Sequence, residues 1–143
     1  MISERQDAAI RLQLLATRLL RLARSAHGKQ GLGSAQYSAL AVLYERGPVS
    51  VVELARVERV AHPTMSRIVG GLERLGAVER RIELRDRRQR QLVLTASGRV
   101  LYESISANRV EAVNAVLARM SAGAVNELAR ALTEAIRSME QQD

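Results

Sequence analysis

The chain has 143 residues, a length that suits one domain or one compact subunit, and it carries a formal net charge of +7. It contains no cysteine, which excludes disulfides, thiol-based redox sensing and thiolate metal sites. No apolar run is long enough to span a bilayer, and the N-terminus lacks the core of a signal peptide, so we expect a soluble cytoplasmic protein. The positive charge lies in the first two thirds of the chain, which favours a polyanionic partner.

Residues 4–27 are predicted to form the first helix. Its apolar residues alternate steps of four and three, at Ala8, Leu12, Leu15, Leu19, Leu22 and Ala26. Ile10, Leu14 and Leu20 widen this stripe beyond what one neighbouring helix would cover. The pattern fits a core helix of a monomer, or a helix shared between two subunits.

A second helix is predicted from Ser34 to about Arg46, because Ser34 is a favoured cap and Gly47-Pro48 ends the pattern. Its apolar residues are Tyr37, Leu40, Leu43 and Tyr44. The start of this helix, with Ser34 and Gln36, can offer backbone N–H groups to a phosphate. Alternatively Ser34 is simply a cap, and the two roles are compatible.

The stretch from Ser50 to Gly76 predicts a helix-turn-helix. Ser50-Val-Val-Glu53 reads as a capping box for a short helix with Leu54, Ala55 and Val57 on its apolar face. The next helix restarts at His62-Pro63, since proline is tolerated in a first turn, and Gly76 is a plausible stop. Its predicted buried face holds Met65, Ile68, Val69, Leu72 and Leu75. The opposite face holds Pro63, Thr64, Ser66, Arg67, Gly70, Gly71 and Arg74, and small polar and arginine side chains suit a major groove.

A basic hairpin is predicted directly after this unit. Residues 78–84 form one strand, with Val78, Ile82 and Leu84 at even positions, and residues 92–94 form its partner. Six arginines lie on this hairpin, too many to pair with Glu79, Glu83 and Asp86: Arg80, Arg81, Arg85, Arg87, Arg88 and Arg90. The hairpin is either a solvated charged loop or a wing that follows the phosphates and places an arginine in the minor groove.

These motifs resemble the MarR family of bacterial and archaeal winged helix-turn-helix transcriptional regulators. The resemblance rests on Pro63-Thr-Met-Ser-Arg-Ile-Val69, Leu72-Glu-Arg-Leu-Gly76, Val78-Glu-Arg-Arg81, Asp86-Arg-Arg88 and Leu94-Thr95 through Gly98-Arg99. Two departures are Ala61, where the family often has a Ser or Thr cap, and Ile82-Glu-Leu84, where it often has Pro or Gly. The family carries an aspartate two residues before a wing arginine, so the resemblance implies that Asp86 holds Arg88 in a fixed pose. The alternative is that Asp86 only caps the turn.

Two C-terminal helices are expected after Thr95, which caps a helix over about 96–120. Ser121 or Gly123 opens the last helix, which reaches about Met139. Their apolar residues repeat at steps of three and four, at Val110, Val113, Leu117, Met120, Val125, Leu128, Leu132, Ala135 and Met139. As in the resembled family, these helices and residues 4–27 are expected to form a dimerisation bundle.

The expected fold is therefore mainly α with a small β-hairpin wing. Residues 34–99 are the winged helix-turn-helix, and residues 4–27 with 96–140 are the dimerisation helices, within a single unit of residues 1–143. The predicted DNA-binding residues are Ser34, Gln36, Pro63, Thr64, Ser66, Arg67, Arg74, Arg85, Asp86, Arg87 and Arg88. Thr64, Ser66 and Arg67 are expected to read bases, and the arginines to contact phosphates.

The resemblance also implies a small-molecule effector, because the family often binds small aromatic acids or phenols between the bundle and the winged helix. The residues that correspond to such a site are Leu19, Tyr37, Tyr44 and Tyr102. These tyrosines are the only aromatic residues in the chain, so a stacking-rich pocket is not expected and the effector stays open.

No catalytic constellation is found in the sequence. His27 and His62 have no ligand-spaced carboxylate or cysteine nearby, so we expect no metal, no cofactor and no enzymatic activity. The predicted function is a dimeric regulator, usually a repressor in the resembled family, that binds a pseudo-palindromic operator and responds to a small anionic or phenolic effector. The alternatives are a constitutive or architectural DNA-binding protein, and a basic enzyme or interaction module, which the missing constellation disfavours.

Overall fold

The structure is a computed structural model that describes residues 1–27, 30–82, 85 and 90–141. It divides into two compact units, one of residues 29–106 and one of residues 1–28 with 107–143. The long helix α5 (Ala96–Leu117) begins in the first unit and continues into the second. Among the described residues, no helix combines the length and apolar character that a membrane span requires.

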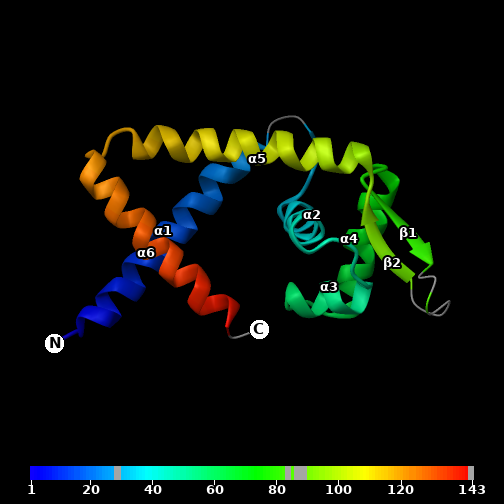
Figure 1. The fold of residues 1–143 in the computed structure, drawn as a ribbon, viewed down its shortest axis with the longest axis horizontal. Helices are drawn as coiled ribbons and strands as arrows, with labels where there is room; N and C mark the ends of the chain where they lie inside the picture. Colours follow the sequence, from blue (N-terminus) through cyan, green and yellow to red (C-terminus); the bar gives the residue numbers. More distant parts are fainter. Residues whose placement is uncertain (28–29, 83–84, 86–89, 142–143) are drawn as a thin grey trace. The chain divides into compact units, whose positions relative to one another are not determined.

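The unit of residues 29–106 has the order predicted for a winged helix-turn-helix (Figure 1). Its elements are α2 (Ser34–Arg46), α3 (Val51–Val57), α4 (His62–Arg74), β1 (Val78–Ile82), β2 (Arg90–Leu94) and the start of α5. All three helices and both strands begin and end close to the predicted residues. This agreement follows from strong local signals, because a cap, a proline or a glycine marks most of the boundaries.

The helix ends show which capping predictions hold. The Ser50 hydroxyl accepts from the Glu53 N–H at 3.1 Å, as predicted, but the Glu53 carboxylate turns to Arg56 at 2.9 Å instead of reaching back. That contact is the main reason why the pKa of Glu53 lies below its ordinary value. Ala61 begins α4 without a side-chain cap.

The end of α4 is a Schellman turn. Gly76 has a φ of +71°, its N–H donates to the Glu73 carbonyl at 3.0 Å, and the Ala77 N–H donates to the Leu72 carbonyl at 3.0 Å. A left-handed residue is required at this position, and glycine adopts it without a Cβ penalty. The predicted stop at Gly76 is therefore confirmed.

The two strands form an antiparallel hairpin that runs in register from Val78 opposite Leu94 to Ile82 opposite Arg90. Val49 extends it through a bridge to Leu92, with N–H to O distances of 2.7 and 3.3 Å. Only the base of the hairpin joins the core: Val78 is buried, whereas Ile82 is 61% exposed. Ile82 shares the even positions of the strand with Val78 but is not covered, because this part of the strand runs beyond the helices of the unit (Figure 1).

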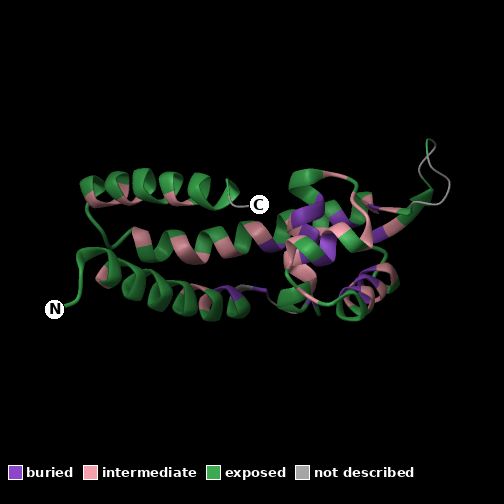
Figure 2. Ribbon diagram, turned by 90° about the horizontal axis from the view of Figure 1, so that it is seen from below, coloured by how far each residue is buried: buried purple, intermediate pink, exposed green. Residues whose placement is uncertain are grey.

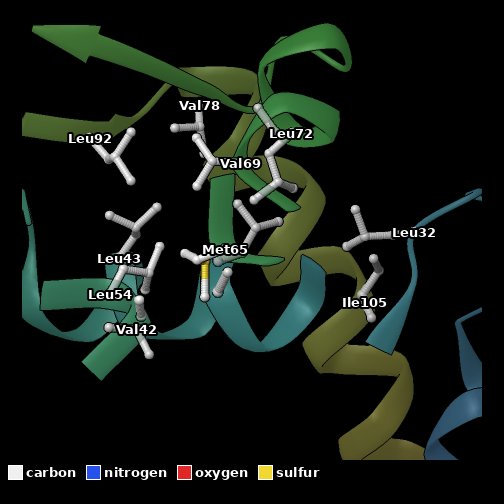
Figure 3. Packing of buried hydrophobic residues seen from close by; sticks show 14 residues of the cluster. Leu32, Val42, Leu43, Leu54, Met65, Val69, Leu72, Val78, Leu92 and Ile105 are labelled. Carbon is white, nitrogen blue, oxygen red and sulfur yellow. The ribbon is translucent and has the colours of Figure 1, made fainter. Parts of the chain in front are cut away.

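The core of this unit is made by the inward faces of α2, α3 and α4 and by the base of the hairpin. Figure 3 shows Met65, Val69 and Leu72 of α4 gathered among side chains from the other elements. All three are at most 1% exposed, and each buried side chain of this size stabilises the fold by roughly 1.5–3 kcal/mol. The recognition helix is therefore held by its apolar face, which leaves its other face for solvent or DNA.

The start of α5 is joined to the turn after α4 by a compact hydrogen-bonded cluster. The hydroxyls of Thr95 and Ser97 both donate to the Gly76 carbonyl, at 2.6 and 2.9 Å. The Thr95 hydroxyl also accepts from the Gly98 N–H at 2.9 Å, which confirms the predicted cap. These bonds tie the end of α4 to the long helix.

The second unit contains α1 (Glu4–Ala26), α6 (Ala122–Glu140) and the C-terminal part of α5. Ser121, one of the two predicted starts, caps α6 by accepting from the Ala124 N–H at 3.2 Å. None of the residues of α6 is buried. Figure 2 shows the helices of this unit as mostly exposed, whereas the winged-helix unit holds most of the buried residues.

Candidate nucleic-acid interface

The polar face of α4 is the centre of the candidate interface. Pro63, Thr64 and Arg67 are exposed, and Ser66 is half-buried. The Ser66 hydroxyl lies 3.5 Å from the His62 Nδ1, one turn earlier on the same helix. These side chains stand on the first two turns of α4, the part of a recognition helix whose residues reach base edges.

Two residues of α4 depart from their predicted faces. Leu75 was placed on the buried face, but it is 50% exposed, because it is the C-cap residue and the chain has already left the helix. Gly71 was placed on the outward face, but it is buried. A Cβ at Gly71 would lie 2.5 Å from the Gln36 amide nitrogen, so the close approach comes from α2.

The start of α2 differs from its prediction. Gly33 is the N-cap and Ser34 is the first helical residue, so the prediction that Ser34 caps this helix is wrong. The Gln36 side chain closes the turn, because its amide oxygen accepts from the Gly33 N–H at 3.0 Å. Ser34 is exposed, so its hydroxyl remains accessible at this helix start.

The arginines of the first wing strand are paired with acids. Arg80 donates to the Glu73 carboxylate at 2.7 Å, and Arg81 donates to Glu79 at 2.6 Å. Glu73 lies on α4, before the predicted strand, and was not counted among the acids near the hairpin because it approaches Arg80 only through the turn at Gly76. The interpretation that most wing arginines lack a partner therefore does not apply to these two.

Arg67, Arg74 and Arg85 are exposed, and no ion pair is found for them within the described ranges. Arg74 follows the surface of its own helix, with one guanidinium nitrogen 3.5 Å from the position of a Cβ on Gly70. Asp86, Arg87 and Arg88 lie outside the described residues. Their predicted arrangement at the wing tip stays a prediction.

The three tyrosines come together within the unit of residues 29–106. Tyr102 of α5 stacks on Tyr37 with ring centroids 5.3 Å apart, and it contacts Tyr44 at 4.5 Å. The Arg99 guanidinium covers the Tyr44 ring at 4.9 Å, and the Tyr44 hydroxyl donates to Glu103 at 3.0 Å. Burial, followed by the neighbouring Tyr37, raises the pKa of Tyr102 above its ordinary value.

The three tyrosine rings pack against one another, so the ring faces that a planar ligand would stack on are already in contact. Leu19, the fourth candidate for an effector site, is half-buried in the other unit, on α1. Sequence reasoning identified the tyrosines but not their mutual stacking, since spacings of 7 and 58 residues carry no local signal.

The ion pairs give an expectation for the salt dependence of DNA binding. Each phosphate neutralised contributes roughly −0.9 to the slope of log K against log salt. Arg80 and Arg81 must give up a carboxylate to contact phosphate, so we expect them to contribute less than Arg74 and Arg85. Titrations of a duplex at several salt concentrations should show a steep slope that Arg85→Ala reduces more than Arg81→Ala. A slope near zero would remove the electrostatic account.

Comparisons with known proteins agree with this geometry. The model of the MarR family matches residues 32–89, the segment from the start of α2 through the first wing strand. No curated protein matches the chain.

Solved structures extend the likeness over the rest of the chain. A MarR family protein from Bacillus stearothermophilus is 25% identical, with a TM-score of 0.84 and coverage of 98% of this chain and 99% of that one. YusO from Bacillus subtilis is also 25% identical, with a TM-score of 0.72 and coverage of 94% and 98%. A mutant of MepR from S. aureus, solved bound to an oligodeoxyribonucleotide, shares the fold at 19% identity, a TM-score of 0.67 and coverage of 92% and 97%.

The family model thus covers the recognition helix, and the structural likeness covers nearly the whole chain. The chain therefore has the winged-helix fold of MarR family transcriptional regulators, whose family model matches residues 32–89, and together with the exposed polar face of α4 these findings support a DNA-binding regulator.

Proposed function

We propose that the protein is a homodimeric regulator that recognises a specific pseudo-palindromic operator, acts as a repressor and is released by a small-molecule effector. The proposed sequence specificity rests on the two faces of α4, one buried and apolar, the other polar. Met65, Val69 and Leu72 anchor the helix in the core, so its polar face has a fixed direction. Thr64, Ser66 and Arg67 on that face are the proposed base-reading residues.

The proposed phosphate contacts surround this helix. They are the backbone N–H groups at the start of α2, with Ser34 and Gln36, then Arg74 at the end of α4, and Arg85, Arg87 and Arg88 of the wing. Asp86 would hold Arg88, because a guanidinium held by a charged hydrogen bond loses less freedom on entering a narrow groove. The oligodeoxyribonucleotide bound to the MepR mutant supports the general use of this fold on DNA.

The helices of residues 1–28 and 107–143 support a homodimer. Large apolar side chains remain exposed along them: Ile10, Leu12, Leu14, Leu15, Leu20, Val110, Val116, Leu132, Ile136 and Met139. Exposed apolar surface of this extent marks an interaction site in a protein of this size. A second copy of the same helices would cover it, and a dimer would supply the second recognition helix that a palindrome requires.

The tyrosine cluster bears on the proposed effector. Tyr37, Tyr44 and Tyr102 stack on one another, so an aromatic ligand would have to compete with these contacts. This observation favours the second candidate, a constitutive DNA-binding protein without an effector. A thermal-shift screen of small anions and phenols, with release from DNA as the readout, separates the two candidates.

Light scattering tests the dimer. We expect the mass of two chains at micromolar concentration, both free and on DNA. We also expect Leu132→Asp to dissociate the dimer and weaken DNA binding, because an unpaired carboxylate would be buried in the interface. A wild-type monomer in both states would contradict the proposed assembly.

A further inference from the structure

The first turn of α2 reaches the recognition helix through the side chain of Gln36. Its amide oxygen accepts from the Gly33 N–H at 3.0 Å. Because that N–H is a donor, the oxygen faces Gly33 and the amide nitrogen takes the other direction. This nitrogen lies 2.5 Å from the place where a Cβ on Gly71 would stand. The Gln36 amide therefore occupies the space that a side chain at position 71 would need.

Gly70, the neighbouring residue, provides a contrast. A Cβ built there would meet the terminal nitrogen of Arg74 at 3.5 Å, which is an ordinary contact. Both glycines lie inside α4, where glycine is disfavoured relative to alanine. An alanine is therefore acceptable at position 70, whereas at position 71 it would displace Gln36.

We propose that Gln36 is a positioning residue for DNA reading, and that its amide, seated on Gly71, fixes the rotation of α4 about its own axis. The apolar contacts of Met65, Val69 and Leu72 hold α4 in the core but are not directional. The Gln36 amide is directional, because its oxygen accepts from the Gly33 N–H while its nitrogen lies at the place of a Gly71 Cβ. Arg67 precedes Gly71 by one helical turn and shares its side of the helix.

This inference rests on the proposed sequence-specific function, but the contact itself can be tested without DNA. Thermal unfolding of Gly70→Ala and Gly71→Ala is compared, each with Gln36 present and in a Gln36→Ala background. With Gln36 present, we expect Gly70→Ala to raise the Tm by roughly 2–6 °C. Gly71→Ala should raise it less or lower it, because the Gln36 amide is displaced. In the Gln36→Ala background the two substitutions should give equal rises.

The second measurement is DNA discrimination. The probes are a duplex that the wild-type protein selects from a randomised library and a shuffled duplex of the same length. Gln36→Ala and Gly71→Ala should each lower the affinity ratio of the two duplexes roughly tenfold, the size of one weakened base contact, with an unchanged salt slope. The double variant should lose no more than either single variant.

Two results would overturn the proposal. Equal Tm shifts for Gly70→Ala and Gly71→Ala with Gln36 present would show that the amide does not fill the Gly71 space. Equal losses on both duplexes in Gln36→Ala, with the ratio of the two affinities unchanged, would make its side chain a sequence-independent contact to the DNA backbone. If the wild-type protein selects no duplex, the proposed function fails as well, and the Tm comparison still decides whether the contact exists.

Discussion

Gly98→Ala is expected to destabilise the winged-helix unit by about 3–5 kcal/mol or to prevent folding. A Cβ at Gly98 would lie within 2 Å of the Ala77 carbonyl oxygen, 2.7 Å from its carbonyl carbon and 3.0 Å from its Cα. These are backbone atoms of the turn after α4, so no side-chain rotation can relieve the overlap. The start of α5 would have to move away and break the bonds that Thr95 and Ser97 make to Gly76.

Denaturant unfolding of Gly98→Ala and Gly123→Ala measures this effect. Gly123 lies on α6, and a Cβ there would meet no atom within 4 Å, so its substitution is the matched control. We expect a large fall in the free energy of unfolding for Gly98→Ala and a change of less than about 1 kcal/mol for the control. Equal stabilities would mean that α5 can be displaced from the turn at little cost.

Arg67→Ala is expected to weaken binding to the operator by about 1–3 kcal/mol more than binding to random DNA. Arg67 is exposed on the polar face of α4, and within the described part of the chain it has no ion-pair partner to give up. A guanidinium presented in this way can form two hydrogen bonds to the O6 and N7 of a guanine. Such a contact discriminates between bases, whereas a phosphate contact does not.

The matched variant is Arg85→Ala, which removes the same side chain from the wing strand region. Its loss should be equal on the operator and on random DNA, as expected of a phosphate contact. Equilibrium titrations of both variants on both duplexes separate the two roles. Equal losses of Arg67→Ala on the two duplexes would make Arg67 a phosphate contact, and base reading would then rest on Thr64 and Ser66.

Local signals were sufficient to predict most of the fold. Ser50, Thr95 and Ser121 cap the helices that they were expected to cap, and Gly76 ends α4. These signals act over three or four residues, so the sequence displays them directly. The prediction at Ser34 failed because the Gln36 side chain satisfies Gly33, and two competing caps one residue apart cannot be ranked from sequence.

Contacts between residues of different elements could not be predicted in the same way. Arg80 meets Glu73 only because the Schellman turn returns the chain beside α4, and Gly71 meets Gln36 across two helices. A glycine in the first turn of a helix, as at Gly98, is a weak hint of close approach. It does not indicate that the neighbour is Ala77. The pairing of residues within the predicted interface is therefore a property of the fold and not of any local sequence signal.

Selection of duplexes from a randomised library by the wild-type protein tests the central claim most directly. A homodimer that reads DNA with one α4 helix per chain should enrich an inverted repeat with half-site centres about 10–10.5 base pairs apart, or a multiple of that spacing. Arg67→Ala should lose the enrichment at one base position in each half-site. Enrichment of a single, unrepeated site, or of no sequence at all, would contradict the proposed dimeric, sequence-specific recognition.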